Sequence, residues 1–440
     1  MAQVAPFCAL RYDPSRVDVQ RVVTQPYDKI TPEMQDRYYA ASPHNLVRII
    51  LGRQQPDDHP GQNVYTRAAA FFQDWRGQGI LRHDLQPSSY PYVQRFTQPG
   101  GGPELERRGF IALGRTEDYS AKVVFRHEQT LAKPKADRLE LLRATRAHFG
   151  QIFMLYSDPA GEIDGLLSED GETVADVDDE YGVQHQLGRI SDPALIERVR
   201  VKMSDKKLII ADGHHRYETA LNYRNECRNT SGAVKAASSA PNELAPYEFV
   251  MMTFVNMDSP GLLILPTHRL VHGLASFSPE EFRTRAREYF SVEEADPAMD
   301  AQRATRLLKA AGRAGTALLA VTADRAFLLD TPKAVGSNCF AGFSLRQQAL
   351  DVVQLHRCLL ENALGISDEA IRDQTNVAYV RDAAEALSRV RSGGANIAFL
   401  MNPARMQQVR DIAFAGEVLP QKSTDFYPKL LSGLTIYALE

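Results

Sequence analysis

The sequence lacks the features that mark several common classes of protein. Its 440 residues contain four cysteines, which are scattered and form no CxxC pair, so a reducing compartment fits better than a disulfide scaffold. No stretch approaches the roughly 20 apolar residues of a transmembrane helix. The first ten residues have neither the basic segment nor the apolar run of a signal peptide. These absences predict a globular protein of the cytoplasm.

An excess of one charge is also missing. The 51 Lys and Arg residues nearly balance the 55 Asp and Glu residues, leaving a net charge of −4. The sequence therefore provides no global positive field for nucleic acid or an anionic membrane, and neither is an expected partner. The apolar fraction of 44% and the charged fraction of 24% are ordinary for a globular protein. The length of the chain suggests two or three domains. The protein could also form a homo-oligomer.

The most informative stretch spans residues 207–221. Residues 208–211 are apolar and predict a short buried strand, and Tyr217, Ala220 and Leu221 follow at helical spacing. The polar residues between them therefore lie on a strand-to-helix turn, and Gly213 allows the chain to bend tightly there.

Such a turn presents free backbone N–H groups at a helix N-terminus, where the helix dipole favours an anion. His214, His215 and Arg216 add hydrogen-bond donors, so the turn indicates a phosphate site that includes Gly213. Asp212 is a candidate ligand for a metal ion, a hydroxyl group or a neighbouring histidine. The alternative is a structural corner in which Asp212 only caps the helix.

A second polar stretch ends a predicted strand at His127 and Glu128. A carboxylate in such a position can act as a general base for a substrate hydroxyl. Equally, Glu128 could be a surface residue paired with a nearby cation. The two residues lack the second histidine of a HExxH zinc motif, which argues against a metalloprotease.

The C-terminal tail is rich in lysine and hydroxyl side chains. Lys422, Ser423, Thr424 and Lys429 could neutralise phosphate groups there, or the tail could be a strap that covers the core. Earlier in the chain, His268 and Arg269 follow a predicted strand. They are candidate substrate contacts, although the pattern slightly favours a surface turn.

Several other stretches predict local structure. Residues 46–51 predict a strand, residues 343–364 a long amphipathic helix, and residues 158–180 an acidic connection. A helix that begins with Thr31 as its cap and Pro32 in its first turn is expected to run to about Ala41.

Together these motifs resemble a bacterial and archaeal family catalogued as domain of unknown function 1015. The shared motifs are Pro26-Tyr27-Asp28, His127-Glu128-x-Thr130, Asp137-Arg138-Leu139, Ala211-Asp-Gly-His-His-Arg-Tyr217, Pro420-Gln-Lys-Ser-Thr424, Pro428-Lys429 and Ser432-Gly433-Leu434. The resemblance spans nearly the whole chain. At its core the family is similar to the ParB/sulfiredoxin superfamily, whose free serine kinases carry a His-Glu turn, a helix, a strand and Asp-Gly-His-His-Arg in the same order.

The resemblance implies an α+β fold with four regions. Residues 105–277 would form a ParB/sulfiredoxin-like mixed core that contains the phosphate turn. An N-terminal α/β region would precede it over residues 1–104. An α/β insert over residues 278–340 and a C-terminal helical cap with the tail over residues 341–440 would follow.

The resemblance also implies a kinase that uses ATP or ADP with Mg²⁺ and phosphorylates the hydroxyl of a small metabolite, first of all free L-serine. Glu128 would be the base, with His127 and Asp212 as further catalytic groups and Asp212 as the metal ligand. Asp28, His268, Arg269 and Lys429 would contact the substrate.

Other functions remain open alternatives. One is a regulator or scaffold that binds CTP or ATP without phosphotransfer. Another is a metal-dependent hydrolase that uses His127, Asp212, His214 and His215, although adjacent residues rarely supply a closed tetrahedral set of ligands. Sulfiredoxin chemistry is not expected, because Cys227 lies three helical turns beyond the phosphate turn.

Overall fold

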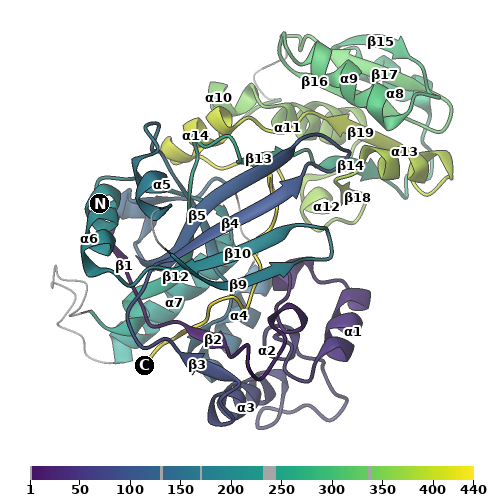
Figure 1. Cartoon of the computed structure of the whole chain (residues 1–440). Coiled ribbons are helices and arrows are strands. Elements are labelled where there is room, and N and C mark those ends of the chain that lie inside the picture. Colours follow the sequence, from purple (N-terminus) through teal and green to yellow (C-terminus); the bar gives the residue numbers. More distant parts are fainter. Residues whose placement is uncertain (1, 129–131, 169–170, 231–243, 335, 337–338) are drawn as a thin grey trace. The chain divides into compact units, whose positions relative to one another are not determined.

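The computed structural model describes residues 2–128, 132–168, 171–230, 244–334, 336 and 339–440. The chain divides into two compact units (Figure 1). The first unit comprises Met1–Arg126, Thr130–Leu263 and Pro428–Glu440, and the second comprises His127–Gln129 and Ile264–Tyr427. Both units combine helices with a sheet, which confirms the α+β class. The four regions and the ParB/sulfiredoxin-like core stay predictions.

A mixed sheet forms the centre of the first unit. Its strand order is β6 (Val124–Phe125), β11 (Leu208–Asp212), β8 (Ile152–Tyr156), β12 (Phe249–Asn256), β5 (Glu104–Arg115), β4 (Tyr90–Thr97), β10 (Gln184–Arg189) and β9 (Glu172–Asp178), and β1 (Val4–Ala5) also pairs with β5. The pairs β11–β6 and β12–β8 are parallel, and the other pairs are antiparallel. All residues of β8 and β12 are buried, as their largely apolar sequences favour.

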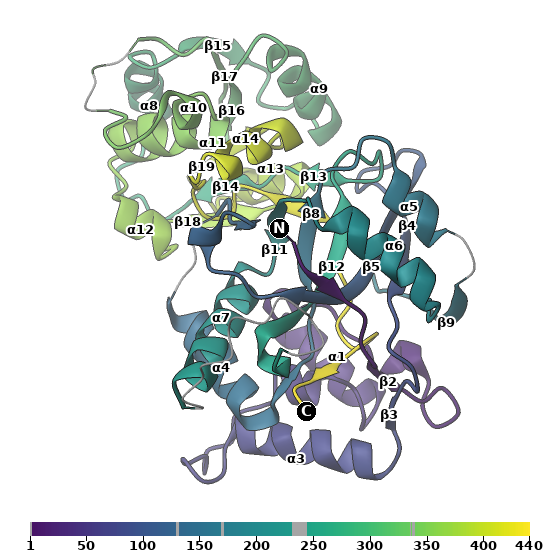
Figure 2. The same cartoon turned by 90° about the vertical axis from the view of Figure 1, so that its left-hand side faces the viewer.

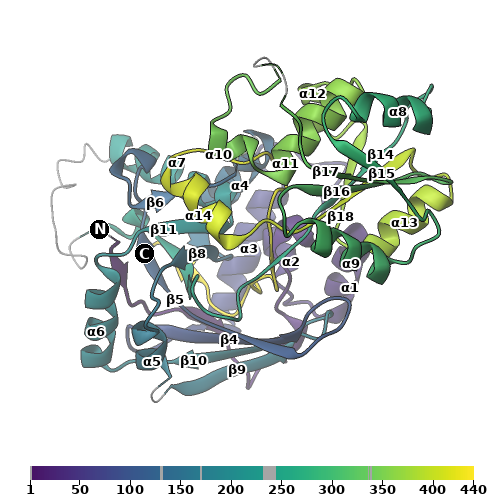
Figure 3. The ribbon, with the colours of Figure 1, turned by 90° about the horizontal axis from the view of Figure 1, so that it is seen from above.

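Three helices share a core with one face of this sheet. They are α5 (Glu162–Leu167), α6 (Pro193–Met203) and α7 (His214–Thr230). Leu166, Val199 and Tyr217 from these helices pack in one apolar cluster with Met154 and Ile210 from the strands. Figure 3 shows α5 and α6 beside the sheet. This packing fixes the end of β11 and the start of α7, where the predicted turn lies.

A second helical layer belongs to the first unit. It contains α1 (Pro32–Ala41), α2 (Val47–Ile50), α3 (Val64–Gly77) and α4 (Ala132–Thr145), with the short pairs β2 (Leu10–Tyr12)–β3 (Leu81–His83) and β7 (Ala147–His148)–β21 (Tyr437–Ala438). Helix α4 lies between α3 and α7 (Figure 2). The predicted start of α1 is confirmed, since the Thr31 side chain accepts a hydrogen bond from the Met34 N–H at 3.3 Å.

The strand prediction for residues 46–51 is wrong, because these residues form α2. The Asn45 side chain accepts a hydrogen bond from the Val47 N–H at 2.9 Å and begins the helical turn. Val47, Ile49 and Ile50 are all buried, so tertiary packing overrides the strand preference of β-branched residues. The predicted acidic connection, residues 158–180, instead contains α5 and β9.

The second unit contains an antiparallel sheet. Its order is β15 (Ser291–Ala295), β17 (Ala326–Asp330), β16 (Ala317–Val321), β19 (Ile397–Met401), β14 (His268–Val271) and β18 (Val377–Val380). Its helices are α8 (Pro279–Ala286), α9 (Ala301–Ala311), α10 (Leu345–Gln348), α11 (Asp351–Gln354), α12 (Asp368–Arg372), α13 (Ala383–Arg391) and α14 (Met406–Phe414), and β13 (Leu263–Leu265) pairs with β20 (Asp425–Tyr427).

Two predictions for the second unit are wrong. The long helix over residues 343–364 is divided into α10, α11 and the π-helix Leu355–Ala363, because Leu350 adopts an extended conformation between α10 and α11. The surface turn at His268 and Arg269 is instead the buried strand β14. Within the described residues, no helix is long and apolar enough to cross a membrane.

The last segment of the chain, Pro428–Glu440, belongs to the first unit. Leu431, Leu434 and Ile436 are buried, Ser432 pairs with Thr24, and the Thr435 hydroxyl lies 3.1 Å from the sulfur of Met251 on β12. This segment is therefore part of the core, as the strap interpretation of the tail requires.

Candidate functional site

The predicted strand-to-helix turn is present in the first unit. Strand β11 ends at Asp212, Gly213 has a φ of +93°, and α7 begins at His214. A Cβ atom on Gly213 would also lie only 3.1 Å from the Nε of Arg216. The backbone conformation therefore favours glycine at this position, and a Cβ atom there would also press on the Arg216 side chain.

Four side chains of the first unit form what we term the turn cluster: Lys29, Asp212, Arg216 and Lys429. A terminal nitrogen of the Arg216 guanidinium lies 3.1 Å from Asp212 Oδ2, and Lys429 Nζ lies 3.9 Å from Asp212 Oδ1. Burial alone would raise the pKa of Asp212. The charges of Lys429, Arg216, Lys29 and His214 outweigh burial and hold that pKa far below its usual range. The positive charges of Lys429, Arg216 and Lys29 thus all act on the Asp212 carboxylate.

Arg216 is held by hydrogen bonds on both sides. Its guanidinium donates to the Gln151 carbonyl as well as to Asp212. The Gln151 side chain is fixed in turn, since its amide donates to the Leu431 carbonyl at 3.1 Å and its oxygen accepts from Thr253 at 2.6 Å. The guanidinium is therefore oriented before any ligand arrives, which lowers the entropic cost of binding.

Lys429 reaches the turn because a buried arginine positions its backbone. The Arg107 guanidinium donates to the Pro428 carbonyl at 2.5 Å, and the Gln94 amide donates to the Lys429 carbonyl at 2.8 Å. Burial lowers the pKa of Arg107 to about 9, and its guanidinium lies 4.6 Å from the centre of the Phe153 ring. The Lys429 side chain is only 8% exposed, so this residue belongs to the site rather than to a solvated surface.

A narrow pocket of the first unit adjoins Arg216. Tyr27, Arg138, Phe149 and Thr219 contribute to its wall, and the Arg138 guanidinium lies 4.1 Å from the centre of the Tyr27 ring. Asp28, a predicted substrate contact, follows Tyr27 on the same short 3-10 helix. Burial raises the pKa of Tyr27 to about 12, and the charges of Arg216 and Asp212 also act on its hydroxyl.

The second unit contains a separate group, which we term the Glu128 cluster: His127, Glu128, Lys422 and Thr424. The backbone N–H of Lys422 donates to Glu128 Oε1, and His127 Nε2 shares a hydrogen bond of 2.8 Å with the Thr424 hydroxyl. Lys422 has a φ of +56°, a left-handed conformation that turns its N–H toward the carboxylate. The tail and the His-Glu pair, almost 300 positions apart, thus come together. The Lys422 side chain itself is exposed.

Arg269 supports the Glu128 cluster from β14. Its guanidinium donates to the Lys422 carbonyl at 3.2 Å and lies 5.1 Å from the centre of the Tyr379 ring. Burial lowers its pKa to about 10, and Tyr379 and Glu128 oppose that shift. His268 differs, because burial and then Arg269 lower its pKa to about 4, and its Nδ1 accepts the Met401 N–H at 3.3 Å. His268 is therefore neutral at pH 7 and lies in the core of the sheet.

The predicted site residues thus fall into two groups. In the first unit lie Asp28, Asp212, Gly213, His214, His215, Arg216 and Lys429; in the second lie His127, Glu128, His268, Arg269, Lys422, Ser423 and Thr424. Ser423 is buried, and its hydroxyl donates to the Pro420 carbonyl at 2.5 Å.

Sequence reasoning missed Lys29, Gln151 and Arg107. The sequence could have revealed Lys29, because this residue directly follows the motif Pro26-Tyr27-Asp28. Gln151 and Arg107 act through contacts made far apart in the chain, and the sequence carries no local signal for them.

A metal-dependent hydrolase gains no support from the structure. Among the residues described, no three or more His, Cys, Asp or Glu side chains are grouped so that they could hold a metal ion. Asp212 is paired with cations instead.

A comparison with family profiles finds one match. The family described as "Protein of unknown function (DUF1015)" matches residues 4–377. No curated protein matches the chain.

Solved structures show a distant likeness. A free serine kinase in complex with AMP has a TM-score of 0.35 and 13% identity, over 71% of this chain and 89% of its own. A conserved hypothetical protein from Pyrococcus furiosus has a TM-score of 0.35 and 12% identity, over 72% and 92%. SbnI from Staphylococcus aureus, with a C-terminal truncation, has a TM-score of 0.34 and 8% identity, over 74% and 87%. Likeness at this level assigns no function, so the argument below rests on the chain's own residues.

The turn cluster predicts how stability depends on Asp212. Asp212→Asn leaves three cations without their carboxylate and should lower the free energy of unfolding by about 3 kcal/mol at pH 7, as for other broken partly buried ion pairs. Because the folded pKa of Asp212 is lowered, its contribution is present above the unfolded pKa near 4 and is lost as pH falls through the folded pKa. Urea unfolding between pH 2 and 8 measures both effects.

Inorganic phosphate provides the second arm of this experiment. It should stabilise Asp212→Asn more than the parent, because an anion can replace the missing carboxylate. The control is Asp205→Asn, whose side chain is 77% exposed just before β11. Equal stability of the two variants would show that Asp212 does not balance the cations.

Proposed function

Since the chain belongs to the DUF1015 family, whose description assigns no activity, we propose that it is a nucleotide-dependent kinase that phosphorylates the hydroxyl of a small metabolite. One observation carries the proposal. The turn cluster brings three cations to bear on the Asp212 carboxylate at the N-terminus of a 17-residue helix. Clustered cations, oriented donors and a helix dipole together favour the binding of a transferring phosphoryl group.

The proposed roles in the first unit follow from these contacts. Arg216 binds phosphate oxygens through its guanidinium, and Lys429 and Lys29 add point charges. The backbone at Gly213, with His214 and His215, supplies further donors. Lys29 joins the predicted set because it is among the charges that lower the pKa of Asp212. Asp28 remains a proposed contact for the acceptor.

In the second unit, Glu128 is the proposed base. It takes the proton of the acceptor hydroxyl while the oxygen forms a bond to phosphorus and the bond from phosphorus to the nucleotide breaks. The Lys422 N–H fixes the position of the carboxylate. His127 and Thr424 hold the segment that carries Glu128, which makes them positioning residues, and Arg269 orients the Lys422 backbone. Lys422, Ser423 and Thr424 are proposed phosphate contacts.

ATP or ADP is the proposed donor, with Mg²⁺. In kinase sites this ion is bound through one or two carboxylates, water and the phosphates themselves, so a single carboxylate fits. Asp212 would hold it, and Lys429 and Arg216 would then be available to phosphate oxygens. When bound, Mg²⁺ neutralises charge that develops on the phosphates.

Free L-serine is the first acceptor to test. Support comes from the order of motifs along the chain, in which a His-Glu pair, a helix, a strand and Asp-Gly-His-His-Arg follow one another as in the free serine kinases. The same resemblance supports a ParB/sulfiredoxin-like core.

The direct test incubates the protein with ATP or ADP, Mg²⁺ and L-serine or another hydroxyl metabolite, and follows phosphorylated product by ³¹P NMR. Glu128→Gln should lower kcat by about 10²–10⁴-fold, the usual contribution of a general base, and leave nucleotide affinity unchanged. Glu369→Gln, an exposed change on α12 of the same unit, is the control and should retain full activity.

Two results would replace the kinase assignment. Absence of product from every acceptor, while nucleotide still raises the melting temperature, would favour a regulator or scaffold that binds CTP or ATP without turnover. Full activity of Glu128→Gln would remove Glu128 as the base.

A substitution of Lys422 tests whether the tail contributes to nucleotide binding. Its side chain is exposed, and its contact with Glu128 is made by the backbone, so Lys422→Met should keep the melting temperature of the free protein. It should weaken nucleotide binding by about 1–3 kcal/mol, the range of charge-assisted contacts. Calorimetry at one salt concentration measures this, with Lys309→Met on α9 as the exposed control. Equal affinity in both variants would confine Lys422 to its backbone role.

A further inference from the structure

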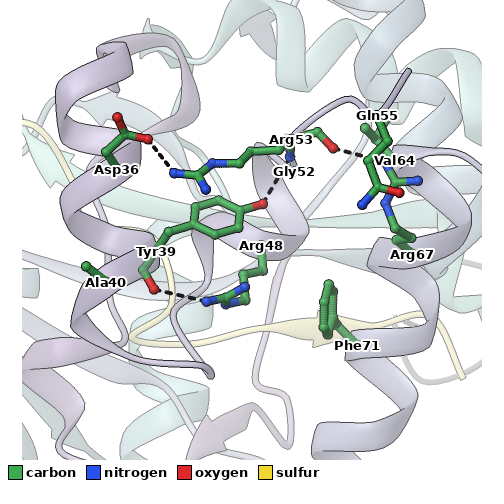
Figure 4. Close-up of a pocket in the computed structure, with 10 residues that line it drawn as sticks. All are labelled: Asp36, Tyr39, Ala40, Arg48, Gly52, Arg53, Gln55, Val64, Arg67 and Phe71. Atoms are coloured by element: carbon green, nitrogen blue, oxygen red, sulfur yellow. Dashed lines mark hydrogen bonds and ion pairs between the residues drawn. The ribbon is translucent and has the colours of Figure 1, made fainter. Parts of the chain in front are cut away.

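The first unit has a second polar pocket, formed by α1, α2, α3 and the loop between α2 and α3 (Figure 4). Its volume is about 530 Å³, within the roughly 300–1,000 Å³ that is typical of small-molecule sites. Three arginines line it: Arg48, Arg53 and Arg67. None of its lining residues belongs to the turn cluster or to the Glu128 cluster. We call it the arginine pocket.

Arg48 and Arg53 both stack on one tyrosine. Their guanidinium carbons lie 4.4 Å and 4.1 Å from the centre of the Tyr39 ring. The ring is held in place, because its hydroxyl accepts the Arg53 N–H at 3.0 Å and the Tyr39 carbonyl accepts a hydrogen bond from Arg48 at 2.9 Å. Stacking on a fixed ring holds each guanidinium group in place.

The arginines differ in how their charge is balanced. Arg67 forms a two-point pair with Asp58 at 2.5 Å and 3.1 Å, and both side chains are largely covered. Arg53 pairs with Asp36, but this pair is exposed and therefore contributes little energy. Asp36 can thus be displaced from Arg53 at low cost.

Arg48 lacks a carboxylate partner among the described residues. Its Nε is buried and donates no hydrogen bond there, although a buried donor without a partner costs about 1–3 kcal/mol. An anion in the pocket would supply the negative charge that the Arg48 guanidinium lacks among the described residues.

We propose that the arginine pocket binds a phosphate monoester of a small organic molecule, up to the size of a nucleoside monophosphate. The phosphate would be held by Arg48 and Arg53, whose planar guanidinium groups match its oxygens. The organic part would pack against the apolar wall that includes Val64 and Phe71. This site is independent of the proposed kinase activity, because it uses other residues and other elements.

The test titrates AMP, O-phosphoserine and inorganic phosphate into the whole protein by calorimetry, which separates a phosphate monoester from the free ion. The parent should bind one of the two monoesters at two classes of site and more tightly than it binds phosphate. Arg48→Met should weaken one class by about tenfold or more, as expected for loss of a charge-assisted contact. Lys429→Met should weaken the other. Hydrogen exchange should slow in Pro32–Ala41 and residues 51–62 when the monoester binds.

Matched variants keep the test decisive. Arg37→Met changes an exposed residue of α1 outside the pocket and should bind as the parent does. Arg53→Met removes a half-exposed side chain, so it should fold even if Arg48→Met does not, and it should also weaken the Arg48-dependent class.

The outcomes separate the two proposals. A single class of site that is lost in Lys429→Met and unchanged in Arg48→Met and Arg53→Met would overturn the arginine pocket and leave the kinase proposal standing. Loss of all binding in Arg48→Met, with Lys429→Met unaffected, would support the pocket and overturn the phosphate role of the turn cluster. Tighter binding of inorganic phosphate than of either monoester would overturn the proposed class of ligand.

Discussion

The first unit depends on the ionised carboxylate of Asp212, which lies against Arg216 and Lys429. Through Lys429 this carboxylate fixes the last segment of the chain. The buried Arg107 side chain holds the same segment by a hydrogen bond to the Pro428 carbonyl. Through Arg216 it fixes the start of α7 and the Gln151 carbonyl. The same arrangement gathers three cations at a helix N-terminus. Structural order and affinity for an anion therefore have one physical origin.

Much of this site follows from short-range patterns in the sequence. An apolar run followed by Asp-Gly-His-His-Arg and helical spacing predicts the strand, the turn and the helix, and all three are present. Gly213 is predicted where the chain bends tightly, and the structure adds that it has a positive φ. The Lys and hydroxyl residues of the tail also predict phosphate contacts. In the structure the end of the tail is a buried segment, and its Lys429 is part of the turn cluster.

What the sequence does not reveal depends on contacts between distant segments. Glu128 and Lys422 are joined by a backbone N–H, which no residue type encodes and which requires a left-handed lysine. Arg107 and Gln151 look like ordinary polar residues until the fold places a carbonyl beside each guanidinium. The β-branched residues of α2 predict a strand, but burial and the hydrogen bond from the Val47 N–H to the Asn45 side chain favour a helical turn. Local propensity decides elements only where packing agrees with it.

The most direct measurement of the central claim compares ADP binding to the parent, Lys429→Arg and Lys429→Met by calorimetry. If the turn cluster binds phosphate through its positive charges, Lys429→Arg keeps most of the affinity and Lys429→Met loses about tenfold or more, as expected for loss of a charge-assisted contact. The difference should shrink as salt screens the charges. Equal ADP affinity in all three proteins, with unchanged folding, would contradict the account.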